Sequence, residues 1–265
     1  MELTTAEIRR AVRAALAEDI GSGDATTLAT IPTNAVAKAA MRAREPLVVA
    51  GIQFAETAFR ELSPKIKIHR KIRNGRRVKA GAMLLKISGP ARAILSAERV
   101  ALNFVQRLSG IATLTARFVE AVHGTKVQIL DTRKTTPGWR RFEKYAVVCG
   151  GGRNYRIGLF DMILIKDNHL AALKNAKPNA IGAAIQCARK KFPKLKIEVE
   201  ADTLKQVEQA LAAGADSPLH GAKRCPAAGR DHCRSTAVCY RRQEAQGGDR
   251  RGPDDWLCRR RDHRS

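Results

Sequence analysis

Three short apolar segments, spaced about 33 residues apart, constrain the fold of this 265-residue chain more than any other feature. They are 127–130, 162–165 and 195–199, and helical patterns at 139–148 and 180–192 separate them. Buried strands that alternate with helices form parallel sheets, because a crossover helix carries the chain back to the same end of the sheet. The pattern therefore predicts a parallel sheet or an α/β barrel, with a further helix at 204–213.

The N-terminal third is organised differently, since strand and helix signals alternate there without a constant spacing. We expect helices at 3–16 and 53–62 and strands at 35–43, 46–52, 66–72 and 83–87. A long helix should follow from Ser96, as its N-cap, to Gly124, with a kink or division at Ser109-Gly110. The predicted fold class is α/β, with an N-terminal α+β sandwich domain over 1–112 and an incomplete α/β barrel domain over 113–216.

The composition changes abruptly near residue 216. Residues 1–216 contain 61 Val, Ile, Leu, Met and Phe, whereas residues 217–265 contain only Leu219, Val238 and Leu257. Before the break there are 17 Lys and 20 Arg, and after it one Lys and 11 Arg. A segment with three aliphatic residues buries too little surface to offset its ordering entropy, so 217–265 is predicted to be a basic, disordered tail. A shifted reading frame, an artificial tail and a natural tail all remain open.

Charge and composition limit the partners. With 49 basic and 25 acidic residues the formal net charge is +24, which suits nucleic acid, phosphorylated metabolites or simply a solvated basic surface. Nucleic acid is not the expected partner, because aromatics are 5% of the chain and no RRM-like aromatic cluster appears in the sequence. No apolar run reaches the roughly 18 residues of a membrane span, the start is too acidic for a signal peptide, and the six Cys lack CxxC spacing. We expect a cytoplasmic protein without a membrane partner.

Charged residues follow each of the three predicted strands. Asp131-Thr-Arg-Lys134 follows the first, Lys166-Asp-Asn-His169 follows the second, and the third carries Glu198 and Glu200 on one face. The carboxyl ends of barrel strands meet at one mouth, where active sites lie. We therefore expect a single pocket to receive Arg133, Lys134, Lys166 and Glu200. Such a pocket suits an anionic substrate together with a Mg²⁺-bound pyrophosphate.

Three consecutive glycines, Gly150 to Gly152, have two interpretations. They allow backbone N–H groups to approach an anion, or they simply end the preceding helix. Arg156, a few residues later, adds a guanidinium that can bind a carboxylate through two hydrogen bonds.

Several longer motifs carry a family resemblance. They are Asp131-Thr-Arg-Lys-Thr-Thr-Pro-Gly138, Glu143-Lys-Tyr-Ala146, Cys149-Gly-Gly-Gly152, Leu164-Ile-Lys-Asp-Asn-His-Leu170, Ile197-Glu-Val-Glu200, Glu18-Asp-Ile-Gly-Ser-Gly-Asp-Ala-Thr-Thr27, Ala97-Glu-Arg-Val-Ala-Leu-Asn103 and Arg107-Leu-Ser-Gly-Ile-Ala-Thr113. In this order, over about residues 10 to 216, the chain closely resembles quinolinate phosphoribosyltransferases, the carboxylating nicotinate-nucleotide pyrophosphorylases. The resemblance implies a pentosyltransferase of NAD biosynthesis that converts quinolinate and phosphoribosyl pyrophosphate, with Mg²⁺, to nicotinate mononucleotide, pyrophosphate and CO₂. It also implies a homodimer, or a higher oligomer, with shared active sites and no tightly bound cofactor.

The resemblance also implies roles for individual residues. Arg133, Arg156 and Lys166 would hold the quinolinate carboxylates, and Arg107 would come from the neighbouring subunit. Lys134 would meet phosphate groups, and Glu200 would help to place Mg²⁺ and the ribose. Lys134, Lys166 and Glu200 form the implied catalytic set, and Thr132 joins the substrate-binding residues. Tyr155 and His169 are further candidates.

Two departures from the family pattern carry consequences. The family's Asn-His-Arg reads here as Asn154-Tyr155-Arg156, and a tyrosine is not a cation at neutral pH. After Asp216 the family's Leu-Asp-Asn strand and Ser-Gly-Gly phosphate loop are missing, and Pro218 should prevent the next buried strand. We therefore expect low activity from this chain. The alternatives are an inactive, basic nucleic-acid-binding protein and a related nicotinate phosphoribosyltransferase.

Overall fold

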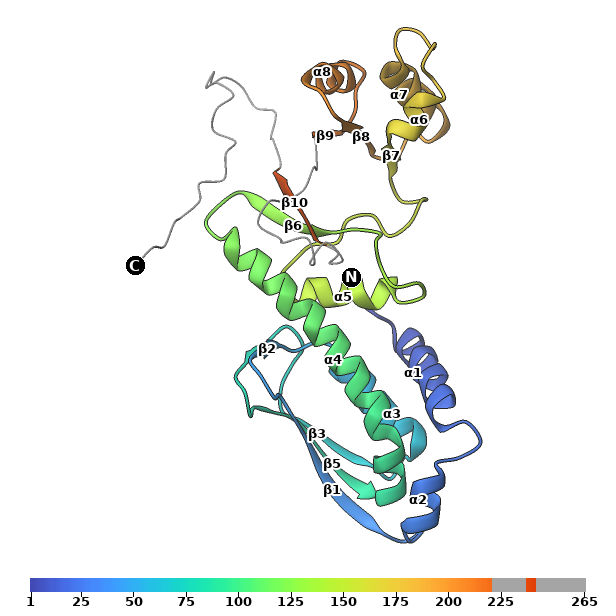
Figure 1. Ribbon diagram of the computed structural model, residues 1–265, viewed down its shortest axis with the longest axis vertical. Coiled ribbons are helices and arrows are strands. Elements are labelled where there is room, and N and C mark those ends of the chain that lie inside the picture. The colour runs from blue at the N-terminus through green and yellow to red at the C-terminus, as the bar shows by residue number, and fades with distance from the viewer. Residues whose placement is uncertain (221–236, 242–265) are drawn as a thin grey trace.

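The computed structural model describes residues 1–220 and 237–241 (Figure 1). The predictions made for 221–236 and 242–265 lie outside these described residues. The elements are α1 (Thr5–Ile20), α2 (Ala25–Thr30), β1 (Val36–Arg42), β2 (Leu47–Val48), α3 (Ile52–Leu62), β3 (Lys67–Arg70), β4 (Arg77–Val78), β5 (Met83–Pro90), α4 (Ala91–Ala121), β6 (Val127–Asp131), α5 (Arg140–Cys149), β7 (Ile163–Ile165), α6 (Asp167–Ala171), α7 (Ala180–Lys191), β8 (Ile197–Ala201), α8 (Leu204–Ala212), β9 (Ser217–His220) and β10 (Ala237–Arg241).

The N-terminal part is a sandwich of an antiparallel sheet and helices (Figure 1). The sheet has the order β1-β5-β3, and the helices α1, α3 and α4 pack together beside it. Its core is one cluster of buried side chains that includes Val12, Phe54, Leu85 and Leu108. Two predictions needed correction here. The expected strand at 46–52 is only Leu47–Val48, and α2 was not anticipated, although Asp24 caps it by accepting from the Thr27 N–H at 3.0 Å.

Helix α4 is one continuous helix of 31 residues, so the predicted N-cap at Ser96 and division at Ser109-Gly110 are wrong. It begins five residues before Ser96, whose hydroxyl instead donates to Asp24 Oδ2 at 2.8 Å. The Ser109 hydroxyl accepts from the Ala50 N–H at 3.0 Å and donates to the Ala50 carbonyl at 3.1 Å. The polar side chains thus bind the sandwich, and the helix backbone continues unbroken.

The second part contains two of the three predicted parallel strands, β7 and β8. Strands β7, β8 and β9 form a parallel sheet in that order, and α7 and α8 pack against β8 around a smaller core that includes Ile165, Ile185 and Val199. Strand β6 lies in a different sheet, where it pairs with β10 in antiparallel orientation (Figure 1). The barrel is therefore incomplete, and the expected fold class is confirmed.

Pro218 does not prevent the next strand, contrary to the prediction. It lies within β9 and aligns with Val199 of β8. Among the described residues β9 has β8 as its neighbour and is an edge strand, a position where a missing N–H is tolerated. The expected disorder of 217–265 therefore does not extend to β9 or to β10.

An aromatic cluster joins α5 to the sandwich. Phe104 of α4 stacks on Phe54 of α3 and on Trp139, with ring centroids 4.8 and 5.0 Å apart. Phe142 of α5 packs edge-on against both Phe54 and Trp139. Because Trp139 directly precedes α5, this cluster fixes the point at which the loop after β6 enters the helix.

Candidate functional site

The loop 132–138 carries the first group of candidate residues and is held at both ends. Asp131, the last residue of β6, is 1% exposed, and Trp139 at the other end lies in the aromatic cluster. Within the loop, the Thr132 hydroxyl accepts from the Lys134 N–H at 3.1 Å. Glu143 of α5 accepts from the N–H and the hydroxyl of Thr136, at 3.2 and 2.8 Å. The loop is thus an ordered turn between a strand and a helix.

A strand-like segment that the sequence analysis missed lies beside β6. Arg153 forms a parallel bridge with Leu130. The Arg153 N–H donates to the Ile129 carbonyl at 2.8 Å, and the Asp131 N–H donates to the Arg153 carbonyl at 3.1 Å. The segment is too polar to show the apolar pattern of a buried strand. The bridge brings Arg156 to the same end of β6 as Arg133.

Arg133 and Arg156 form the cationic centre of the site. Burial lowers the pKa of the Arg133 guanidinium, and Arg156 and Arg140 lower it further because like charges repel. The Nε atom of Arg133 is buried and has no hydrogen-bond partner within the described part of the chain. A group in this state favours an anion that accepts hydrogen bonds.

The other half of the site comes from the second sheet. Lys166, just after β7, forms an ion pair with Glu200 of β8, with 2.8 Å between Nζ and Oε1. Glu198, two residues before Glu200, is 6% exposed, and burial raises its pKa, with a further increase from Glu200. Tyr155 lies next to Glu198, and burial raises the pKa of its phenol, as does the nearby carboxylate. Tyr155 and Arg156 thereby link the β6 end to the β8 end.

The remaining candidates lie differently. His169 accepts the Lys166 N–H on Nδ1 at 2.9 Å and so caps α6, which is a structural role. Arg107 of α4 donates to Thr136 and to Glu143 of its own chain, both at 2.8 Å, with its side chain 55% exposed. Four residues were expected in one pocket. The structure pairs two of them, Lys166 and Glu200, and places a third, Arg133, beside Arg156. The fourth, Lys134, donates its backbone N–H to Thr132.

The glycine run serves packing. A Cβ on Gly150 would come within 2.4 Å of the Ala112 carbonyl oxygen, and one on Gly152 would come within 2.7 Å of a Val147 side-chain atom. The glycines let the end of α5 approach α4 closely. Of the two interpretations left open by the sequence, the end of the helix is therefore the one that the geometry favours.

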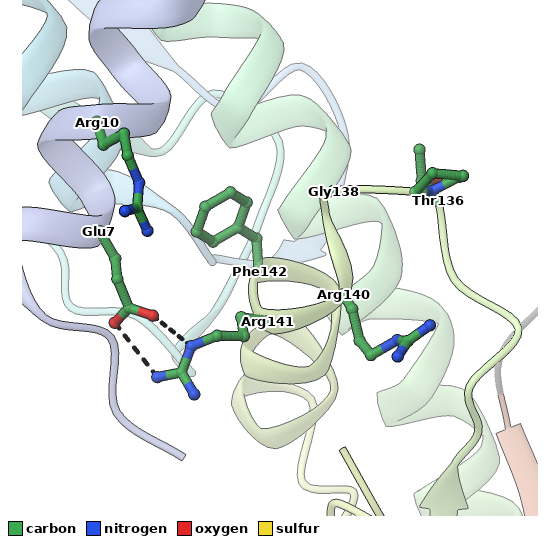
Figure 2. A pocket seen from close by; sticks show the side chains of 8 residues that line it. Glu7, Arg10, Thr136, Gly138, Arg140, Arg141 and Phe142 are labelled. Carbon is green, nitrogen blue, oxygen red and sulfur yellow. Dashed lines mark hydrogen bonds and ion pairs between the residues drawn. The ribbon is translucent and has the colours of Figure 1, made fainter. Parts of the chain in front are cut away.

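A pocket of about 330 Å³ lies next to the loop, between α1 and the start of α5 (Figure 2). Arg141 reaches across it to form an ion pair with Glu7, whereas Arg140 is directed away from that pair. Arg140 donates instead to the Thr135 hydroxyl and the Ile157 carbonyl, both at 3.1 Å. Arg140 therefore connects the loop after β6 to the segment that follows Arg156.

The fold and the site together define a two-part α/β protein whose strand ends carry arginine and lysine side chains. A family model described as the quinolinate phosphoribosyl transferase N-terminal domain matches residues 24–109, and one for the C-terminal domain matches 111–218. This chain belongs to the quinolinate phosphoribosyltransferase family.

Relatives and solved structures agree. The chain is 42% identical over 218 residues to a chloroplastic carboxylating nicotinate-nucleotide pyrophosphorylase of Arabidopsis thaliana, covering 81% of this chain and 62% of the relative. It is 44% identical over 207 residues to the Mycobacterium leprae protein of the same name, covering 77% and 71%. The crystal structure of NadC from Streptococcus pyogenes matches with a TM-score of 0.78 at 40% identity, over 82% of this chain and 76% of that one. This chain thus spans about three fifths of the length of its plant relative.

Two further findings on the described residues concern metal-binding groups and membrane-spanning helices. Within the described ranges no group of three or more His, Cys, Asp or Glu side chains is arranged to hold a metal ion. No helix in that part of the chain is long and apolar enough to cross a membrane.

Proposed function

We propose that this chain is a quinolinate phosphoribosyltransferase that joins quinolinate to phosphoribosyl pyrophosphate and releases pyrophosphate and CO₂ to give nicotinate mononucleotide. The observation that supports it best is the Arg133–Arg156 pair, in which a buried guanidinium nitrogen has no partner among the described residues. Quinolinate carries two adjacent carboxylates, and such a dianion suits two neighbouring guanidinium groups. Membership in the family supports the same substrate.

In this proposal, Arg133, Arg156 and Lys166 bind the two carboxylates and orient the pyridine nitrogen toward the ribose. The nitrogen displaces pyrophosphate from the ribose, and Lys134 and Thr132 contact phosphate oxygens. The ribosyl centre becomes cationic as the pyrophosphate leaves, and the Glu200 carboxylate stabilises that charge. The carboxylate next to the ring nitrogen then leaves as CO₂, and a proton replaces it on the carbon.

Mg²⁺ fits this site as a companion of the substrate. The side chain of Glu200 is 42% exposed, so its carboxylate is open to a ligand, and Mg²⁺ in proteins commonly binds one or two carboxylates together with substrate phosphates. When bound, Mg²⁺ would neutralise charge on the departing pyrophosphate.

We further propose a cytoplasmic homodimer, in which Arg107 completes the partner's site. The Arg107 side chain contacts Thr136 and Glu143 of its own chain but is still more than half exposed, so it is accessible to a second copy. Sedimentation velocity at micromolar concentration should show a dimer. A chain that sediments only as a monomer would leave each site without this arginine and would contradict the proposal.

The reaction itself provides the test. Purified chain with quinolinate, phosphoribosyl pyrophosphate and Mg²⁺ should form nicotinate mononucleotide and CO₂ in equal amounts. Replacing quinolinate with nicotinate should abolish CO₂ release and greatly reduce nucleotide formation. Nucleotide formation from nicotinate at the same rate would contradict the proposed substrate and favour a nicotinate phosphoribosyltransferase.

A further inference from the structure

A buried ion pair lies next to the site. Neither of its side chains contacts substrate in the mechanism proposed above. Lys144 of α5 and Asp131 of β6 are 0% and 1% exposed, and Lys144 Nζ donates to Asp131 Oδ1. It is the one ion pair among the described residues whose two side chains are both completely buried. Removing two charges from water is costly, so a pair of this kind needs additional hydrogen bonds to be retained.

Those hydrogen bonds all come from the segment that leads to Arg156. The Tyr155 N–H donates to Asp131 Oδ1 at 2.8 Å, and the Tyr155 carbonyl accepts from Lys144 Nζ at 3.4 Å. The Asn154 side-chain amide donates to Asp131 Oδ2 at 2.6 Å and to the Lys144 carbonyl at 2.9 Å. The ion pair therefore binds the Tyr155 backbone from both sides, and the Asn154 side chain adds a further hydrogen bond to Asp131.

The position of this network matters because of the charges that it supports. Arg133 and Arg156 lie close enough to lower the pKa of Arg133, so without a ligand they repel one another. Repulsion between the two guanidinium groups favours any backbone movement that separates them. Asp131 lies two residues before Arg133, and Asn154 lies two residues before Arg156, so the network fixes both arms close to their charged ends.

We propose that Asp131, Lys144 and Asn154 are positioning residues that hold Arg133 and Arg156 at the spacing needed for a dianionic ligand. This inference rests on the proposed function for the identity of that ligand, quinolinate. The network lowers the cost of binding because the two cations are already in place before the ligand arrives. It touches no substrate atom and acts only through the two arginines.

Two variants separate positioning from general stability. Asn154→Ala keeps the ion pair and removes the side chain that connects it to the segment. The double variant Asp131→Asn/Lys144→Met removes both buried charges together, which avoids leaving one of them unpaired. Arg70→Met is the matched control, because it breaks an ion pair with Glu56 (2.8 Å from Nε to Oε1) in the sandwich, far from the site in the sequence.

The measurements are quinolinate binding by calorimetry, thermal unfolding, and hydrogen exchange at the Tyr155 amide. We expect Asn154→Ala and the double variant to weaken quinolinate binding by about tenfold or more and to accelerate exchange at Tyr155. Arg70→Met should lower the unfolding temperature with quinolinate affinity unchanged. If Asn154→Ala and the double variant bind quinolinate like the parent chain, or lose no more affinity than Arg70→Met, the inference is overturned.

The exchange measurement also distinguishes this inference from the proposed function. A parent chain that binds no quinolinate contradicts the proposed function, and exchange at Tyr155 then decides the role of the network alone. Unchanged exchange at Tyr155 in Asn154→Ala would show that the network does not hold the segment, whatever ligand the site binds.

Discussion

Single charged side chains decide what this site can bind. Arg133→Ala and Arg156→Ala each remove one charge-assisted contact to a carboxylate, so each should weaken quinolinate binding by about 2 kcal/mol or more. Calorimetric titration of both variants measures this loss. Unchanged quinolinate affinity in both would remove these arginines from the site.

A substitution at Tyr155 should strengthen quinolinate binding instead of weakening it. Its phenol is neutral and lies beside the Glu198 carboxylate, which with Glu200 would favour the protonated form of an imidazole at the same place. Tyr155→His therefore adds a cation to the site and should tighten quinolinate binding, and this gain should fade as the pH rises and the imidazole loses its proton. Tyr155→Phe is the control, since it removes the hydroxyl without adding charge. Affinity for quinolinate that stays constant or falls in Tyr155→His would contradict this view of residue 155.

The sequence revealed the charged residues at the strand ends but not the contacts that support them. Arg133, Lys166 and Glu200 follow apolar segments, so their place at strand ends could be predicted. Asp131 and Lys144 could not be recognised as a buried pair, because burial of a charge depends on contacts with Asn154 and Tyr155 that spacing does not reveal. Ser96 was predicted from its residue type to be an N-cap, and its hydroxyl instead donates to Asp24.

Among the elements, α4 and α5 approach each other closely at Gly150, near the site. Gly150→Ala would force a Cβ to within 2.4 Å of the Ala112 carbonyl oxygen, which is backbone and cannot rotate away. We expect this substitution to lower the free energy of unfolding by about 1–3 kcal/mol, the usual cost of overpacking. Gly124→Ala, where a Cβ would meet nothing within 4 Å but the φ of +81° costs strain, is the comparison. Chemical denaturation should show a larger loss for Gly150→Ala, and a smaller loss would contradict the packing role.

The elements with regular apolar spacing were those that the sequence predicted well. Strands β6, β7 and β8 and helices α5, α7 and α8 lie within a few residues of their expected bounds. The segment around Arg153 was missed because it pairs with β6 through its backbone while its side chains are polar. The prediction that Pro218 prevents a strand was wrong, because β9 lies at the edge of the described sheet, where a proline is tolerated.

For the whole molecule, we expect the region after Asp216 to limit turnover. The family resemblance places a metal-side aspartate and a phosphate-binding glycine loop there, and this sequence contains neither motif. Replacing 217–265 with an in-frame family C-terminus should therefore raise the rate of nicotinate mononucleotide formation and the solubility of the protein. A chain that already turns over as fast as the repaired one would show that the present C-terminal sequence supplies equivalent groups.

We expect residues 1–216 to assemble a site for a dianionic pyridine. The most direct test is calorimetric titration of the full chain with quinolinate and, separately, with nicotinate, which has one carboxylate. We predict that quinolinate binds appreciably more tightly than nicotinate, and that Arg156→Ala removes most of the difference. Equal affinity for the two acids, or a difference in affinity that remains in Arg156→Ala, would contradict a dianion site built on Arg133 and Arg156.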